Sequence, residues 1–306
     1  MSPCILFIGA EFSGLPVHRM TDQISRRFFI ATTGMLVMPL VAGCGERKTP
    51  AGEESLPDLT QPLENLHGML RMQASLAEED VPWSFDGTIY GVVGESEPQP
   101  LVRFQGSEVY WVRALGDGTF ELTGHTVSFF YDIDSGEPLE NFANPYTGRR
   151  NTVAAAVQGG GAGYGFNYSE QGVRPTRFLD KMPGKPLQLR WRTARDTIWM
   201  HAETAYPPGL PQPRKQSQTM FARIDDFADR SVRNLPATFS STVFGPWLDW
   251  MDMDGEPGHL IWHAAGAKIA SVADLPAEFR MRLEREHPER MTAYPFAETQ
   301  KRSDFQ

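Results

Sequence analysis

The chain has 306 residues, a formal net charge of −9 at pH 7, 11% aromatic residues and two cysteines. The negative charge argues against nucleic acid as a partner, because phosphate binding needs concentrated lysine and arginine, and the sequence contains no basic patch interleaved with aromatic residues. Cys4 lies in a region that we expect to be removed, so a disulfide in the mature chain is excluded and stability must come from packing.

The beginning of the chain has the features of an export signal. Arg26 and Arg27 form a twin-arginine sequence, and the apolar run over 28–42 that follows is too short and interrupted to span a membrane. The run ends in small residues ahead of Cys44, which resembles the lipobox of bacterial lipoproteins. We therefore expect export to the periplasm and membrane attachment only through lipid on Cys44. An ordinary signal that happens to end near a cysteine is the alternative.

The position of the signal also predicts how the chain is divided. An n-region that begins at Met1 would be unusually long, whereas Met20 gives a normal one, so we expect translation to start at Met20 and 1–19 to be upstream sequence. The predicted organisation is a signal over 1–43, a polar tether over 44–57 and a single β-rich domain over 58–306.

The first predicted element of the domain is a helix. Leucines recur at helical spacing from Leu59, Pro62 stands near the first turn, and the pattern continues to about Glu79. A second helix over 275–287, between Asp274-Leu275-Pro276 and Pro288, is predicted at the other end of the chain.

From Val81 the pattern changes to alternating apolar and polar residues separated by glycine-containing turns, which is typical of strands. Strands at regular spacing, with few helices between them, favour an antiparallel sheet over a parallel α/β sheet. The predicted fold class is mainly β: a single antiparallel β-barrel or closed sandwich with an N-terminal and a C-terminal helix. The expected strands cover 83–91, 100–106, 109–115, 120–122, 127–131, 187–193, 197–202, 218–224, 237–243 and 259–269.

One stretch, Tyr131–Arg149 (YDIDSGEPLENFANPYTGR), carries a family resemblance together with Pro246-Trp247-Leu248 and the later run HAAGAK over 263–268. In these blocks the chain resembles the uncharacterised family catalogued as domain of unknown function 1838, whose members are mostly bacterial and include exported proteins with twin-arginine signals. The resemblance covers roughly 70–295 and departs from the family pattern at Phe142, where a Trp is usual. It implies one domain and no particular chemistry, because no activity is established for the family.

Several motifs suggest ion or phosphate sites, but each has a simpler explanation. His259 and His263 would share a metal on a helix, yet in a strand they lie roughly 13 Å apart. The aspartates at 132, 134, 249, 252 and 254 fit turns better than a calcium loop. The glycine run over 159–165 lacks the ending of a P-loop and predicts a loop or lid. We expect neither a metal nor a cofactor.

The candidate catalytic residues are His201, Asp249 and His263. Alternation in the predicted strand over 197–206 puts Trp199, His201 and Glu203 on one face. If that face points inward, His201 beside Glu203 is an acid–base pair, and if it points outward, the pair is a solvated surface. The oligomeric state is left open.

Three hypotheses for function follow. The first is a protein that binds a small apolar or aromatic molecule in a β-barrel. The second is a lyase, isomerase or hydrolase that uses His201 or His263 as base, with Asp249, Tyr146 and Arg149 as partners. The third is a structural envelope protein without a pocket. The turn over 144–149 is either one wall of a pocket or a plug. The expected binding residues are Asn144, Tyr146, Arg149, Trp199, Trp247 and Trp262.

Overall fold

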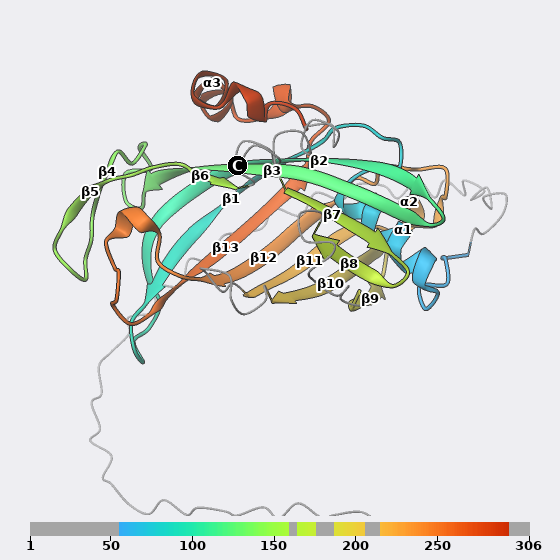
Figure 1. Ribbon diagram of the computed structural model, residues 1–306, viewed down its shortest axis with the longest axis horizontal. Helices are drawn as coiled ribbons and strands as arrows, with labels where there is room; N and C mark the ends of the chain where they lie inside the picture. The colour runs from blue at the N-terminus through green and yellow to red at the C-terminus, as the bar shows by residue number, and fades with distance from the viewer. Residues whose placement is uncertain (1–54, 159–163, 176–186, 206–214, 294–306) are drawn as a thin grey trace, which may run out of the picture. The chain divides into compact units, whose positions relative to one another are not determined.

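The computed structural model describes residues 55–158, 164–175, 187–205 and 215–293, all within one compact unit (Figure 1). The predicted signal, Cys44 and most of the predicted tether lie outside the described residues, as does most of the glycine run. None of the helices in the described ranges is long and apolar enough to cross a membrane.

The fold is built on one antiparallel sheet of 11 strands, with a small hairpin beside it. The hairpin strands are β4 (Asn141–Ala143) and β5 (Arg150–Thr152). The strands of the large sheet are β1 (Val81–Val92), β2 (Gln99–Gly116), β3 (Thr119–Asp132), β6 (Ala156–Gln158), β7 (Tyr164–Ser169), β8 (Gly172–Pro175), β9 (Leu189–Ala194), β10 (Thr197–Ala205), β11 (Lys215–Arg223), β12 (Thr238–Gly245) and β13 (His259–Lys268). Strands β4 to β8 were not predicted from the sequence. Of the loop or lid predicted over 159–165, the described residues Tyr164 and Gly165 belong to strand β7.

The mainly antiparallel β fold is confirmed, but the prediction of a closed barrel is wrong. The hydrogen-bonded order runs β8-β7-β3-β2-β1-β13-β12-β11-β10-β9, with β6 paired to β3, so it begins and ends at different strands. Helix α1 (Pro62–Gln73) lies between the two arms of the curved sheet (Figure 1). His67 of α1 packs against Phe120 of β3 with ring centroids 5.3 Å apart. On the other side, the Trp191 indole of β9 donates to Asn65 at 2.6 Å. A helix about 10 Å wide keeps the arms too far apart for strand pairing.

The apolar stripe of α1 fills the inner face of the sheet at this end. Leu66, Leu70 and Met72 are at most 1% exposed and belong to one buried cluster with Trp83 of β1 and Met220 of β11. The predicted N-terminal helix is therefore confirmed, but it ends at Gln73 and not near Glu79. It stops there because the chain then pairs elsewhere: the amide of Leu76 donates to the carbonyl of Arg233 at 3.1 Å. The short helix α2 (Ile224–Ala228) adds Phe227 to the same cluster.

The other end of the inner face carries a second cluster, centred on Ile89 and Leu260 and covered by the 3-10 helix η3 (Asp249–Met251). A continuous path of aromatic rings joins the two clusters, with neighbouring centroids 5.2 to 6.3 Å apart, a spacing at which aromatic pairs stabilise each other. In order, the path is Trp83, Phe239, Phe85, Phe104, Trp262, Phe130, Trp250 and Phe142. The inner face is thus held together by aromatic packing along its length.

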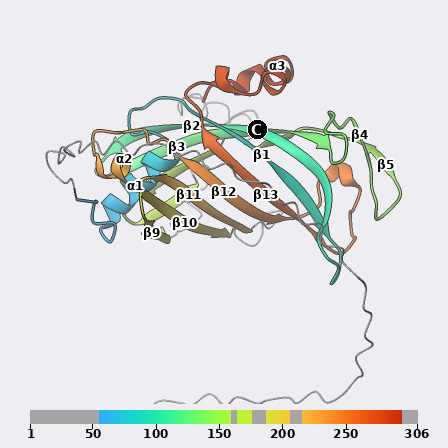
Figure 2. The same cartoon turned by 180° about the vertical axis from the view of Figure 1, so that it is seen from behind.

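The C-terminal helix covers the opposite, outer face. Helix α3 (Ala277–Glu286) packs Phe279 and Leu283 on Val127 and Phe129 of β3, and all four are at most 1% exposed. Figure 2 shows α3 on the opposite side of the sheet from α1. Two short 3-10 helices flank it, η4 (Val272–Asp274) with a capping box at Ser271 and η5 (Pro288–Arg290). The predicted closing helix is therefore confirmed.

Candidate functional site

The register of β10 decides where the predicted acid–base pair lies. Met200 is buried in the inner cluster that contains α1. Because successive side chains of a strand point to opposite faces, Trp199, His201 and Glu203 lie on the outer face. Of the two alternatives in the sequence, the structure therefore places the pair on the solvated side of the sheet, with 27% of the His201 side chain and 63% of the Glu203 side chain exposed.

His201 nevertheless has defined partners on that face. Its Nδ1 lies 3.0 Å from Oγ1 of Thr219, the residue directly opposite on β11, and its Nε2 lies 3.4 Å from Oε1 of Glu203. The same Glu203 oxygen accepts a hydrogen bond from Arg190 of β9 at 2.8 Å. These contacts orient the imidazole at a site that solvent can reach.

The other two predicted catalytic residues lie elsewhere. His263 is exposed on the outer face of β13, and the register places two strands, β11 and β12, between it and Glu203, a distance of roughly 14 Å. Asp249 is exposed at the start of η3. The structure therefore does not bring the three predicted catalytic residues together. Within the described ranges, no group of three His, Cys, Asp or Glu side chains is placed to hold a metal ion.

The turn between β4 and β5 contains the predicted hydrogen-bonding residues. Asn144, only 2% exposed, accepts hydrogen bonds from the amides of Tyr146 (2.8 Å) and Thr147 (3.3 Å), which is the geometry of an Asx turn. The backbone N–H of Asn144 also donates to the backbone carbonyl of Arg149 at 2.8 Å, and Gly148 has a positive φ of 71°. The sequence folds into a tight hairpin end because Asn and Gly tolerate these conformations.

The residues that follow in this turn point in opposite directions. Tyr146 packs against Trp247 with ring centroids 5.4 Å apart, and its hydroxyl lies over Gly91 of β1, where an added Cβ would be 2.6 Å away. Burial raises the pKa of Tyr146. Arg149 points outward and donates to Asp252 at 2.6 Å, with 65% of its side chain exposed. The turn is thus a closure of the inner face, with Tyr146 inside and Arg149 outside.

Two polar atoms at this closure have no partner within the described residues: the Tyr146 hydroxyl and the Trp247 indole nitrogen, both buried. Trp262, the third predicted aromatic binding residue at this end, is half-buried between Phe104 and Phe130. Tyr146, Trp247 and Trp262 therefore belong to one packed end of the inner face, while Trp199 lies on the outer face.

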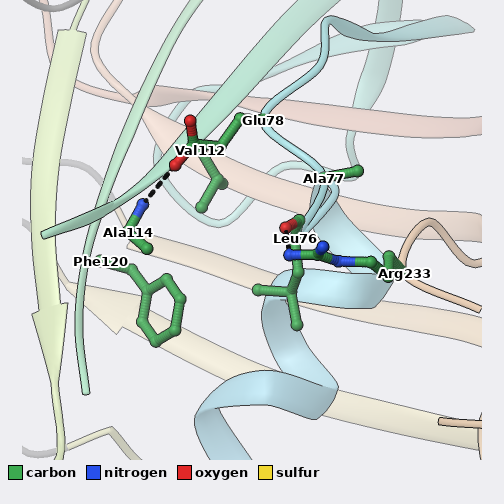
Figure 3. A pocket seen from close by; sticks show the side chains of 7 residues that line it. All are labelled: Leu76, Ala77, Glu78, Val112, Ala114, Phe120 and Arg233. Carbon is green, nitrogen blue, oxygen red and sulfur yellow. Dashed lines mark hydrogen bonds between the residues drawn. The ribbon is translucent and has the colours of Figure 1, made fainter. Parts of the chain in front are cut away.

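The structure shows a pocket that the sequence reasoning missed (Figure 3). Its volume is about 320 Å³, and it lies where the chain leaves α1 and faces the end of the β2–β3 hairpin. Its lining residues are Leu76, Ala77, Glu78, Val112, Ala114, Phe120 and Arg233. They come from three distant parts of the chain and form no motif. Only the alternation of β2 and β3, which puts Val112, Ala114 and Phe120 on the inner face, could have pointed to it.

Polar contacts fix the mouth of this pocket. A Glu78 carboxylate oxygen accepts from the amide of Ala114 at 3.1 Å, and the Arg233 guanidinium donates to the carbonyl of Leu76 (Figure 3). Glu78 has a φ of 55°, a left-handed conformation that is uncommon for residues other than glycine. The pocket is therefore lined by one acidic and one basic side chain in addition to its apolar residues.

Comparison with known families supports the resemblance predicted from the sequence. The family model described as "Protein of unknown function (DUF1838)" matches residues 200–304, which include β11 to β13 and α3. The Asn144–Arg149 turn lies outside the matched residues, and the twin-arginine signal stays a prediction. A search of curated proteins finds no match.

Proposed function

We propose, for a chain that resembles a family of unknown function, that it binds a small molecule with an apolar or aromatic body in the pocket beside Phe120. The observation that carries the proposal is the pocket itself: about 320 Å³, lined by five apolar residues and by the charged side chains of Glu78 and Arg233. Ligand sites are typically concave and mostly apolar, with few polar groups, and begin near ~300 Å³. A cavity of roughly 150 Å³ suffices for benzene, so a two-ring molecule is the expected size.

The charged residues at the mouth indicate which polar group the ligand carries. Glu78 already accepts a hydrogen bond from Ala114, and Arg233 donates to Leu76. A guanidinium has five N–H donors, so Arg233 keeps donors for a ligand. The ligand is therefore expected to present an acceptor, such as a carboxylate or carbonyl oxygen, on the side of Arg233.

The conformation of Glu78 is a second support. A left-handed non-glycine residue costs about 1 to 3 kcal/mol and persists where the surroundings impose it, often at ligand sites. Here the hydrogen bond to Ala114 of β2 holds Glu78 in place. The strain is consistent with a loop that is shaped for binding.

We also propose that the protein works at the periplasmic side of a membrane. The support is the sequence: the twin arginines at Arg26 and Arg27, the short apolar run and the small residues before Cys44. Lipid on Cys44 would keep the sheet domain close to the membrane, where apolar molecules are concentrated.

The test is a binding titration of the full chain with 1-naphthoate. Ala77 is exposed at the pocket, so Ala77→Trp should fill the space without disturbing the core, and Ala270→Trp is a matched control at an exposed position outside the lining. We expect at least tenfold weaker binding for Ala77→Trp and none of this loss for Ala270→Trp, with unchanged melting temperatures. Arg233→Gln should weaken 1-naphthoate more than naphthalene. Equal affinity of Ala77→Trp and the unchanged protein would refute the proposal and favour a structural role.

A further inference from the structure

Three polar side chains on the outer face form a hydrogen-bonded series that is independent of the pocket. Thr219 Oγ1 lies 3.0 Å from His201 Nδ1, and His201 Nε2 lies 3.4 Å from Glu203 Oε1. A carboxylate only accepts hydrogen bonds, so Nε2 carries the proton in the neutral ring, and Nδ1 accepts from the Thr219 hydroxyl. A hydroxyl, an imidazole and a carboxylate in this order are the parts of a hydrolytic triad, which is recognised by geometry and not by sequence position.

The sheet fixes the relative position of these groups. Thr219 and His201 are directly opposite each other on β11 and β10, and both strands pair along their full described length. Arg190 lies opposite His201 on β9 and donates to Glu203 at 2.8 Å. Rigid strands hold reacting groups more precisely than loops do. The imidazole is thus held from two sides, while 27% of its side chain is open to solvent.

The neighbouring residues supply two further features that an ester substrate needs. Trp199 and Phe221 lie next to the triad on the same face, with ring centroids 6.4 Å apart, and offer an apolar surface. Ser240 of β12 lies directly opposite Thr219, so its side chain is on the same face about 5 Å away. In the scheme below, its hydroxyl would donate to the carbonyl oxygen that becomes negative during attack.

We propose that this outer face hydrolyses carboxylic esters with a small apolar or aryl group, with Thr219 as nucleophile and His201 as general base. The Thr219 oxygen attacks the ester carbonyl carbon while its proton moves to Nδ1 of His201. The tetrahedral intermediate collapses, the bond to the alcohol oxygen breaks, and His201 returns the proton to the leaving alcohol. Water then attacks the acyl-threonine ester with His201 again as base, which releases the carboxylic acid and restores the Thr219 hydroxyl.

Glu203 is a positioning residue in this scheme. It holds the proton on Nε2 and stabilises the imidazolium that forms during attack. Arg190 in turn holds Glu203 and so acts through it. Removal of a general base typically lowers the rate by about 10² to 10⁴.

The experiment measures hydrolysis of p-nitrophenyl butyrate by the full chain. Thr219→Val preserves the shape and strand propensity and removes only the hydroxyl, so it should lower the rate at least 100-fold, whereas Thr219→Ser should keep most of it. His201→Gln should lose activity to a similar degree. Thr242→Val, another outer-face threonine on β12, is the matched control and should leave the rate unchanged. When the reaction of the wild-type chain is quenched early, mass spectrometry should show a butyryl group on the peptide that contains Thr219.

Two results would overturn the proposal: no hydrolysis above the spontaneous rate by the folded wild-type chain, or a Thr219→Val variant as active as the wild type. Melting temperatures separate loss of activity from loss of folding. Because the pocket variant Ala77→Trp changes a different site, it should leave ester hydrolysis unchanged, so failure here and failure of the proposed ligand pocket can be told apart.

Discussion

The carboxamide nitrogen of Asn144 donates to the carbonyl oxygen of Met251 at 2.5 Å, across 107 positions of the chain. The same side chain closes its own turn through its oxygen, so one buried amide joins the β4–β5 hairpin to η3. Tyr146 also packs against Trp247, so two of the blocks that carry the family resemblance, 131–149 and 246–248, meet in space.

This relationship predicts a large effect of Asn144→Ala. Three hydrogen bonds would be lost and the Met251 carbonyl left without its partner in a buried place, so we expect a loss of about 3 kcal/mol in the free energy of unfolding. Asn144→Asp keeps the turn acceptor but removes the donor to Met251 and should lose an intermediate amount. Urea denaturation checks both. Arg149→Ala breaks only an exposed ion pair and should change stability little. A loss of stability in Arg149→Ala equal to that in Asn144→Ala would contradict the conclusion that the hydrogen bonds of Asn144 stabilise this part of the fold.

The packing of Phe85 predicts that Gly106 of β2 tolerates no side chain. An added Cβ would lie 2.1 Å from one atom of the Phe85 ring and 2.8 Å from the Ser128 hydroxyl. Overpacking of this kind costs about 1 to 3 kcal/mol, so Gly106→Ala should lower the melting temperature clearly. The double variant Gly106→Ala with Phe85→Leu should recover part of the loss. If the loss in the double variant equals the sum of the losses in Gly106→Ala and in Phe85→Leu, the two positions are not in contact.

Because Lys268 is buried, we expect the free energy of unfolding to rise with pH above about pH 7. Its ammonium donates to the carbonyls of Arg71 and Ala74 at the end of α1 and to the Asn234 side chain. Burial nevertheless lowers its pKa from 10.5 to about 7. Between pH 7 and 10.5 the unfolded chain then binds more protons than the folded one, so the free energy of unfolding should increase with pH over this window. Lys268→Met should flatten the increase; denaturation at several pH values measures it.

Because Glu121 is buried, we expect the free energy of unfolding to fall as the pH rises towards about 7. Its carboxyl is 1% exposed on the outer face of β3, and burial raises its pKa from 4.5 to about 7, although Arg113 at 2.8 Å opposes the shift. Between pH 4.5 and 7 the folded chain therefore binds more protons, and the free energy of unfolding should fall as the pH rises. Glu121→Gln should remove this fall relative to the wild type. A pH dependence identical in both proteins would show that the carboxyl titrates normally.

The proposed export predicts separate effects of the two signal features. Replacement of Arg26 and Arg27 by lysine should keep the full precursor in the cytoplasm, because the twin-arginine sequence is read as an address. Cys44→Ser should leave export intact but release the protein from the membrane fraction and abolish incorporation of labelled palmitate. Cell fractionation with antibody detection measures both. Membrane attachment of Cys44→Ser would contradict lipid anchoring.

Much of the fold could be predicted from local patterns. The leucine stripe of α1, the proline and aspartate signals of α3 and the alternation of β1, β2 and β3 are local, since each follows from the period of the element and from turn residues. The end of α1 at Gln73 was missed because Arg233, the partner of Leu76, lies far away in sequence. The strands β4 to β8 were missed because runs of three to six residues are too short to show a clear alternation of apolar and polar residues.

The candidate sites depended more on the tertiary structure. Alternation correctly predicted that Trp199, His201 and Glu203 share a face, but not that this face is the outer one. The partner Thr219 could not be identified without the β10–β11 register. For the pocket, no local pattern links Leu76, Phe120 and Arg233, which meet only because the chain leaves α1 beside the β2–β3 hairpin.

The sequence by itself therefore determined the strand-rich class, the two terminal helices of the domain and the two faces of each strand, because these depend on residue periods of 2 and 3.6. The tertiary structure alone decided that the sheet stays open around α1, that Tyr146 is inside and Arg149 outside, and that His201 meets Thr219. These outcomes depend on which distant surfaces bury the most apolar area together, and that competition is settled only when the whole chain packs.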